Sequence, residues 1–263
     1  MEAKEVEGVR KGGVADVVEG NNSLDREAIS LPLDSYLISF HEARIISKAR
    51  IALIASCMRG FGYEYAPSES KGGPKTANER RYGLTDAAQA ERQGYNMRIS
   101  EPADPSVDEE KVLTGASSVA RGKSVPEGGC YREADEKLGK GDEGSIGLAQ
   151  KLNVKSYEMS MKTTQVARVF SQWSACMKER GFLYGNPLAP LNDEKFIGEK
   201  MTEKEKRTAR LDVLCKEKVS LVSRWEAEEA KIQQQLIKVN MDALVSGKRK
   251  KDAYVENAEK LIP

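Results

Sequence analysis

The four cysteines of this 263-residue chain are the residues whose type and spacing could do the most definite chemistry. Cys57 and Cys176 each begin the pattern Cys-Met-x-x-x-Gly-aromatic-x-Tyr, and Cys130 and Cys215 follow one copy each. Four cysteines can form two disulfides, remain as buried thiols or hold a zinc ion. No two of them have the close spacing of a structural zinc site or of a C-x-x-C redox motif. The sequence therefore favours two disulfides, with buried thiols as the main alternative and a zinc site as a weaker one.

The two copies of the motif predict how the cysteines pair. Aligned without a gap, the matched positions are Cys57 with Cys176, Met58 with Met177, Gly62 with Gly181, Tyr63 with Phe182, and Tyr65 with Tyr184. Each copy ends a predicted helix and is followed by a proline and then by a second cysteine, which indicates an internal duplication. Four cysteines allow three pairings, and the duplication favours Cys57 with Cys130 and Cys176 with Cys215. Because disulfides persist in oxidising compartments, we expect an extracytoplasmic protein, secreted or attached to the envelope.

The glycine and the aromatic residues of the motif have two possible roles. Gly62 and Gly181 are expected to end their helices, and an apolar residue beyond such a glycine commonly packs back onto the helix. The alternative is that the aromatic side chains form a surface that binds a partner. The candidate partner-binding residues are Tyr63, Tyr65, Tyr82, Tyr95, Phe182 and Tyr184.

Other residues that could do chemistry lack the partners that a reaction requires. His41 is the only histidine, so a site with several histidines is excluded, and we place this residue on a helix surface. The S-x-x-K spelling of residues 68–71 falls in a predicted loop, and the glycines of residues 141–147 indicate a linker and not a phosphate loop. We predict no catalytic residue, no cofactor and no metal site.

Charged side chains are numerous and are expected to be solvated. Acidic neighbours such as Glu109 and Glu110, or Glu226 and the residues next to Glu229, have no apolar surroundings in the sequence that would raise a pKa. The basic tract 248–251 is interpreted as a solvated helix end, with contact to anionic lipid or wall polymer as the alternative.

The elements that must position these residues are expected to be mainly α-helices. Helical periodicity or helix-forming composition predicts helices at about 36–58, 84–93, 131–138, 156–180 and 203–245. Asp34 or Ser35 is expected to cap the first of them. Thr202 and Glu205 spell a capping box at the start of the last, and Gly247 is expected to end it.

These helices are predicted to form two helical-hairpin modules, each with one disulfide. Residues 1–30 are polar and glycine-rich, which predicts a disordered N-terminal tether. Residues 31–150 make the first module, with a loop-rich insertion at 66–129, and residues 151–263 make the second, with the long C-terminal helix. At about 40 residues that helix would be about 60 Å long, so we expect a break or a free distal end.

Composition excludes several classes of function. Lys and Arg (42) nearly balance Asp and Glu (41), and the formal net charge of +1 produces no field that would attract nucleic acid. An apolar content of 39% can fill a core, whereas no apolar run is long enough to cross a membrane. The first residues lack the apolar stretch of a secretory signal, so export would mean that Met1 stands in place of a removed leader.

Several short segments also resemble a known family. They are Leu31-Pro32-Leu33-Asp34-Ser35-Tyr36, Cys57-Met58, Arg81-Tyr82-Gly83-Leu84-Thr85-Asp86, Gly94-Tyr95, Gly128-Gly129-Cys130, Trp173-Ser174-Ala175-Cys176-Met177 and Arg180-Gly181-Phe182. The chain resembles, over nearly all of its length after residue 30, an uncharacterised family of secreted or lipid-anchored proteins of actinomycetes. The resemblance implies export and implies no activity. Members commonly carry a lipobox cysteine, which this sequence lacks.

The sequence favours a non-catalytic envelope or secreted protein that binds a protein partner or a cell-wall component. One alternative is a wall-active hydrolase that uses carboxylates, which would require a cleft with a carboxylate of raised pKa. Another is a coiled-coil subunit of a secreted assembly, built on the predicted long helix at 203–245.

Overall fold

The fold is mainly α-helical, as predicted. A computed structural model describes residues 29–67, 76–95, 104–139, 143–196 and 201–262. Apart from residues 29 and 30, the predicted N-terminal tether lies outside these ranges. In chain order the elements are η1 (Pro32–Tyr36), α1 (Phe40–Gly60), α2 (Ala87–Gln93), α3 (Val107–Thr114), β1 (Val119–Ala120), β2 (Lys123–Ser124), α4 (Gly129–Leu138), α5 (Glu143–Met161), α6 (Thr164–Glu179), η2 (Ala189–Asn192), η3 (Glu194–Phe196), α7 (Glu203–Lys218), α8 (Leu221–Val239) and α9 (Met241–Lys260).

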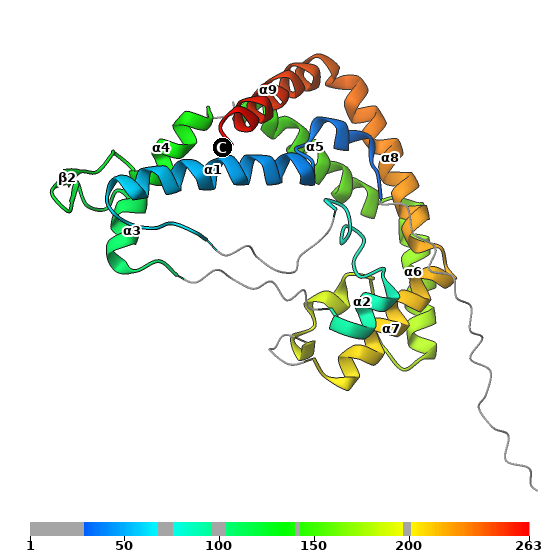
Figure 1. Ribbon diagram of the computed structural model, residues 1–263. Helices are drawn as coiled ribbons and strands as arrows, with labels where there is room; N and C mark the ends of the chain where they lie inside the picture. The colour runs from blue at the N-terminus through cyan, green and yellow to red at the C-terminus, as the bar shows by residue number, and fades with distance from the viewer. Residues whose placement is uncertain (1–28, 68–75, 96–103, 140–142, 197–200, 263) are drawn as a thin grey trace, which may run out of the picture.

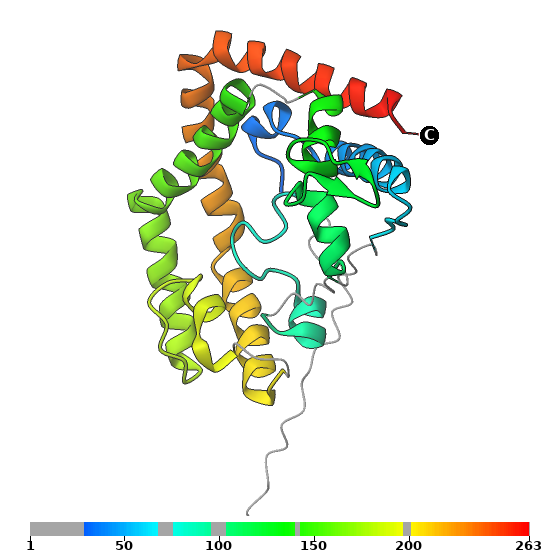
Figure 2. The same cartoon turned by 90° about the vertical axis from the view of Figure 1, so that its left-hand side faces the viewer.

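The helices form an arch with a lobe at each end (Figure 1). We call α1, α3, α4 and the β1–β2 hairpin the first lobe, and α6, α7, η2 and η3 the second lobe. Helix α8 runs from the second lobe towards α9, which packs along α1, and α5 packs against both α8 and α9. The view turned by 90° shows α8 beside the α5–α6 segment along one side of the molecule (Figure 2). The long elements α5 and α8 therefore connect the two lobes.

Both predicted disulfides are confirmed. Cys57 on α1 pairs with Cys130 on α4, and Cys176 on α6 pairs with Cys215 on α7. The Cα atoms of each pair are 5.7 Å apart, within the usual range for a disulfide. Each bridge thus joins the last turns of one helix to a second helix of the same lobe.

The two copies of the motif share one backbone geometry. Gly62 and Gly181 have φ values of +75° and +88°, in the left-handed region that glycine favours. The N–H of Tyr63 donates to the carbonyl of Met58 (3.1 Å), and the N–H of Phe182 donates to the carbonyl of Met177 (3.0 Å). This is the Schellman type of helix end, in which the residue after the glycine bonds back across the last turn. The predicted helix stops are confirmed, whereas the duplication of the whole chain stays a prediction.

The first long helix begins later than predicted. Asp34 accepts a hydrogen bond from the N–H of Leu31 (2.8 Å) and so closes the short 3₁₀ turn that follows Pro32. Helix α1 then starts at Phe40, with Ser39 as its N-cap. The expected cap at Asp34 or Ser35 was wrong because Asp34 is used in the preceding turn.

The insertion at 66–129 contains more structure than the mostly irregular loop that was predicted. The short helix expected at 84–93 is present as α2, but α3 and the β1–β2 hairpin were not expected. The hairpin turns at Arg121 and Gly122, whose positive φ values of 46° and 74° suit a two-residue hairpin turn. We call residues 76–95 the strap, because they pack on the second lobe and on α8 although they belong to the insertion.

The predicted long helix at 203–245 is three helices. It breaks at Ser220, which has a φ of +51°, and again at Asn240, whose side chain donates to the carbonyl of Leu236 (2.7 Å). Serine and asparagine weaken a helix because their side chains compete for its backbone groups. The predicted stop at Gly247 was wrong, since α9 continues through this buried glycine to Lys260.

Two further boundaries differ from the prediction. The linker expected at 141–147 is largely the first turn of α5, which begins at Glu143. The helix expected at 156–180 is the end of α5 followed by α6, because Thr163 caps a new helix. The basic tract 248–251 lies inside α9 and is not a helix end, and it is solvated only in part. Arg249 and Lys250 are exposed, whereas Lys251 is only 3% exposed and forms an ion pair with Glu42 of α1.

The largest buried cluster brings together residues from distant parts of the chain. Its members are Tyr82, Val166, Val169, Trp173, Cys176, Met177, Cys215, Leu221 and Trp225. Tyr82 comes from the strap, and the other members come from α6, α7 and α8. Both tryptophans of the chain are in this cluster, and its position between the second lobe and α8 makes it the core on which the strap is seated.

Candidate functional site

The structure does not assemble the predicted aromatic surface. Tyr63 and Tyr65 pack against the core of the first lobe, whereas Phe182 and Tyr184 pack against the cluster of the second. The Tyr184 hydroxyl donates to Asp193 (2.7 Å). The four motif aromatics therefore serve two separate cores, in the packing role that a Schellman helix end allows.

Tyr82 and Tyr95, the other two candidates, are buried residues of the strap. Tyr82 is fully buried, and its ring lies 4.8 Å from that of Trp225. Tyr95 is 6% exposed and stacks on Phe196 of η3 at 5.6 Å. Neither ring faces solvent, so both hold the strap against its neighbours and do not form a free surface.

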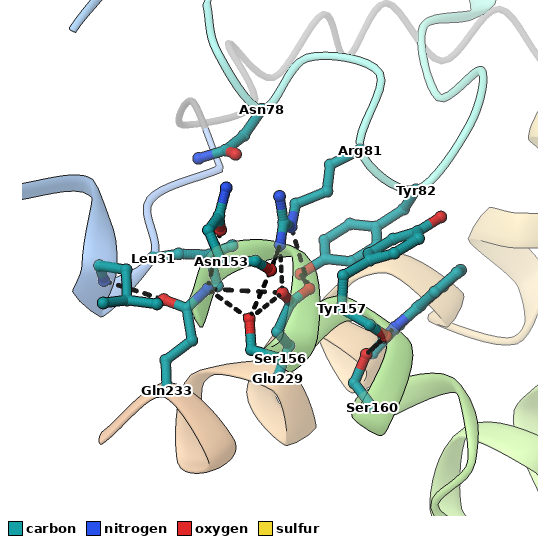
Figure 3. A network of polar contacts seen from close by, with 12 residues as sticks. Leu31, Asn78, Arg81, Tyr82, Asn153, Ser156, Tyr157, Ser160, Glu229 and Gln233 are labelled. Carbon is teal, nitrogen blue, oxygen red and sulfur yellow. Dashed lines mark hydrogen bonds and ion pairs between the residues drawn. The ribbon is translucent and has the colours of Figure 1, made fainter. Parts of the chain in front are cut away.

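The seat of the strap contains a buried polar network centred on Glu229 of α8 (Figure 3). Arg81 donates two hydrogen bonds to this carboxylate, one from Nε at 3.0 Å and one from Nη2. The Tyr82 hydroxyl donates to Oε2 (3.0 Å), and the Ser156 hydroxyl donates to Oε1 (2.9 Å). The Glu229 side chain has no exposed area, so the carboxylate depends on these donors in place of water.

The network continues along α8 to the start of the described chain. Gln233 donates to Asn153 (3.2 Å) and Ser156 (3.0 Å) of α5, and it accepts from the N–H of Leu33 (2.8 Å). One turn of α8 before Glu229, the Trp225 indole donates to the hydroxyl of Ser160 (2.7 Å). The Glu229 network thus connects α5, α8, η1 and the strap, and the Trp225–Ser160 hydrogen bond is a separate contact between α8 and α5.

Burial and the Glu229 charge set the protonation of the two strap residues. Burial alone lowers the pKa of Arg81, but the hydrogen bonds and negative charge of Glu229 outweigh it and hold this pKa above its ordinary value. Burial, and then the nearby Glu229 charge, raise the pKa of Tyr82 far above that of a free tyrosine. Arg81 is therefore charged and Tyr82 is a neutral hydrogen-bond donor at physiological pH.

A second buried ion pair holds the strap further along. Lys216 of α7 lies 3.0 Å from Asp212, and both side chains are almost completely buried. Lys216 also donates to the carbonyl of Leu84 in the strap (2.8 Å), while Asp212 accepts from the indole of Trp173 (2.9 Å). Burial raises the pKa of Asp212 and lowers that of Lys216, and each partner's charge opposes that shift.

The end of the strap meets Glu205 on α7. Thr202 caps α7 as predicted, but the Glu205 side chain does not complete the capping box and instead accepts from the N–H of Tyr95 (3.0 Å). Arg80 donates to the carbonyl of Tyr95 (3.4 Å). Oε2 of Glu205, and Nε and Nη2 of Arg80, are buried and have no hydrogen-bond partner among the described residues.

Sequence reasoning missed the role of Glu229. The expectation that the acidic residues here are solvated and have no apolar surroundings was wrong, because Glu229 is fully buried and burial raises the pKa of the neighbouring Glu226. The spacing of Leu221, Trp225, Glu229 and Gln233 contains a usable signal, since two polar residues continue an apolar stripe at every fourth position. A polar residue in such a stripe is expected to be buried with a partner.

Two further candidates, His41 and Glu109, lie in the first turns of their helices. His41 is exposed in the first turn of α1. Glu109 caps the start of α3 by accepting from the N–H of Ser106 (2.9 Å). The S-x-x-K segment at 68–71 lies outside the described residues. In the described ranges, no three His, Cys, Asp or Glu side chains are grouped as a metal site would require.

The described helices include none that is long and apolar enough to span a bilayer. Comparison with known proteins adds no relative: no family model, no curated protein and no solved structure matches this chain.

Proposed function

We propose that this chain is a non-catalytic binding protein of an extracytoplasmic compartment, secreted or attached to the envelope, whose partner is a protein or a cell-wall component. The observation that carries the proposal is the pair of disulfides. Each joins two helices of one lobe, and three of the four cysteines are almost completely buried. Bridges in such core positions persist where the surroundings are oxidising.

The buried polar groups support a non-catalytic role. Glu229 and Asp212 have no exposed side-chain area, and the donors around them are part of the protein itself. A general acid or base must lie within hydrogen-bond reach of its substrate. These two carboxylates are better explained as the groups that seat the strap.

The two alternative functions receive less support. A wall-active hydrolase needs an accessible carboxylate of raised pKa, and Asp212, whose pKa burial raises, is enclosed by Lys216 and Trp173. A coiled-coil subunit would use the helix predicted at 203–245, and this segment is interrupted at Ser220 and Asn240.

Two measurements test the proposal. For protein recovered from its natural compartment, we expect the intact mass to rise by four hydrogens on reduction, because two bridges open. Free thiols before reduction would contradict the assigned compartment.

The second measurement concerns binding and turnover together. Oxidised protein is incubated with isolated bacterial cell walls and, in parallel, with extracted envelope proteins, and protein that has been reduced and alkylated serves as the control. We expect saturable retention by one of the two fractions and no release of soluble wall fragments. Release of fragments would show a hydrolase, and retention by neither fraction would overturn the binding function.

A further inference from the structure

The strap behaves structurally like a bound peptide. It lies within the loop that Cys57 and Cys130 close, yet the helices of that bridge, α1 and α4, are not its main contacts. Its hydrogen-bond partners are on α5, α7 and α8 and in the segment 29–34, and its apolar side chains also contact α6 and η3. The surface that receives it is therefore built almost entirely by other parts of the chain.

The first half of the strap is recognised through specific side chains. The Arg81 guanidinium meets the Glu229 carboxylate as a fork, a geometry that selects arginine over lysine. The Tyr82 ring enters the cluster of both tryptophans, and its hydroxyl reaches the same carboxylate. The Glu229 carboxylate thus binds an arginine and the aromatic residue that follows it.

The second half is recognised through shape and main-chain contacts. The carbonyl of Leu84 accepts from Lys216, and the N–H of Tyr95 donates to Glu205. Helix α2 between them packs on α7, with contacts among Leu84, Ala90, Tyr95, Phe196, Ala209 and Val213. These contacts select a short helix with an apolar face.

Two glycines bring the strap backbone close to its seat. Gly83 and Gly94 have φ values of +82° and +60°. A Cβ atom at Gly83 would lie 2.9 Å from Nζ of Lys216, and one at Gly94 would lie 2.4 Å from Oε1 of Glu205. A side chain would be strained at either position. The residues that receive the strap, which we call the seat, therefore require glycine directly after the arginine–aromatic pair.

We propose that this seat is a peptide-binding site, occupied by the strap within the chain and able to take a segment of a partner protein with the same chemistry. The ligand is an extended Arg-aromatic-Gly-apolar segment followed by a short amphipathic helix. The inference rests on the proposed function, because it names the site and the kind of protein partner.

The unmatched atoms at the seat indicate why a partner segment can compete with the strap. Glu205 Oε2, and Nε and Nη2 of Arg80, are buried without partners among the described residues. Leaving a buried polar atom unpaired weakens an interface. We expect a partner segment that donates to Oε2 of Glu205, and that has no arginine with unmatched donors at the Arg80 position, to bind more tightly than the strap itself.

The disulfide permits a direct test on the full chain. Protease sites are placed within 68–75 and within 96–103, both inside the loop closed by Cys57 and Cys130. Cleavage at both frees the strap as a peptide, while the disulfide keeps the rest of the chain as one covalent molecule. After gel filtration under native conditions, rebinding of a fluorescent peptide of residues 76–95 is followed by anisotropy.

We expect saturable rebinding that the Arg81→Ala substitution in the peptide weakens by at least about 100-fold, because it leaves Glu229 buried without its cation. Arg92→Ala is the matched control, since Arg92 is exposed on α2, and its peptide should bind like the original. Equal binding of the Arg81→Ala and original peptides would overturn the proposal.

A second measurement covers the case in which the cleaved protein unfolds. In the uncut protein, we expect the strap amides to exchange with solvent as one group, faster than the amides of α8 around Glu229. Exchange of the strap only together with α8 would overturn the proposal. Retention by walls or envelope proteins in the preceding assay does not depend on this outcome, so the two proposals fail separately.

Discussion

The first and second lobes start from the same motif and carry the same kind of bridge, but the surroundings of the two bridges differ. Cys130 lies among apolar side chains, including Ile54, Met58 and Leu113. In the second lobe, the fully buried Cys215 is followed directly by Lys216, which is paired with Asp212. One bridge is in an apolar core, and the other adjoins a buried ion pair.

The motif therefore determines the helix end and the cysteine position, while the surrounding core is free to diverge. The ends of both helices have the same hydrogen bonds because glycine and its neighbours act locally. The ion pair of the second lobe also holds the strap, since Lys216 donates a hydrogen bond to the carbonyl of Leu84. Polar groups are buried where the insertion of the first lobe crosses to the second.

The largest effect is expected where the network is broken. Glu229→Ala should lower the free energy of unfolding by about 3 to 5 kcal/mol, because Arg81 stays largely buried without its counter-ion. Glu228→Ala is the control: Glu228 is partly exposed and pairs with the exposed Lys231, and loss of this pair should cost about 0 to 1 kcal/mol. Urea unfolding of both variants measures the difference. Similar losses in the two would mean that Glu229 does not hold the strap.

Removing the disulfide with the shorter loop is expected to lower the free energy of unfolding more than removing the one with the longer loop. By chain entropy alone, the longer loop of Cys57–Cys130, with a separation of 73 residues against 39, should be worth about 0.5 kcal/mol more. We expect the Cys176→Ala/Cys215→Ala variant to lose about 3 to 4 kcal/mol and the first-lobe variant about 1 kcal/mol less. The reason is that both sulfurs of the second bridge are buried, whereas Cys57 is partly exposed.

Urea unfolding of the two double alanine variants under identical conditions gives the order. A larger loss in the first lobe would show that loop closure outweighs packing. Hydrogen exchange of the strap in the second-lobe variant adds a readout of the Lys216 contact, which should loosen only there.

Acid should weaken the ion pair between Glu42 of α1 and Lys251 of α9 before it affects the buried pair of Asp212 and Lys216 in the second lobe. Burial raises the pKa of Glu42, but hydrogen bonds from Lys251 and Ser39 outweigh it, so this pKa lies below its ordinary value. The Glu42–Lys251 ion pair therefore adds to the free energy of unfolding above about pH 4.5, and this contribution is lost as the pH falls through the folded-state pKa of Glu42. Asp212 has the opposite sign: its pKa is raised in the fold, so its protonation in acid removes no stability.

Glu42→Gln tests this difference. We expect the variant to be less stable than the original by about 1 kcal/mol at pH 7 and equally stable near pH 3. Glu259→Gln, an exposed residue at the end of α9, is the control and should keep the original pH dependence. If the free energy of unfolding of Glu42→Gln fell with acid as steeply as that of the original protein, the Glu42–Lys251 pair would not be the cause of the acid sensitivity.

Local features could be predicted from the sequence, and features that depend on distant partners could not. The helix stops at Gly62 and Gly181 and the pairing of the cysteines follow from a motif that acts within a few residues. The spacing along α8 marks Glu229 as a buried polar residue, but its partners could not be identified, because Arg81 and Ser156 are 148 and 73 residues away in the chain. The end of α9 was missed for the same reason: Lys251 is held by Glu42, from α1.

A further small effect is expected from the way each lobe satisfies the carbonyls at its helix end. In the second lobe, Arg180 donates to the carbonyl of Cys176 in the preceding turn (2.9 Å). The first lobe has Phe61 at the matched position, and the cation comes instead from the hairpin: Arg121 donates to the carbonyls of Phe61 (3.2 Å) and Gly62 (2.7 Å). The insertion thus supplies the arginine that the first copy of the motif lacks.

Arg121→Ala should therefore destabilise the first lobe by about 1 kcal/mol, because α1 loses a cation at its C-terminus and the Tyr63 ring loses the guanidinium 3.9 Å from its centroid. Arg180→Ala should have a similar effect in the second lobe, and Arg132→Ala, which loses only surface ion pairs, should have less. Urea unfolding gives the sizes, and hydrogen exchange at the amides of Tyr63 and Phe182 gives the location. Faster exchange at both amides in Arg121→Ala would mean that the two helix ends are not independent, and that the lobes are coupled more closely than their separate cores indicate.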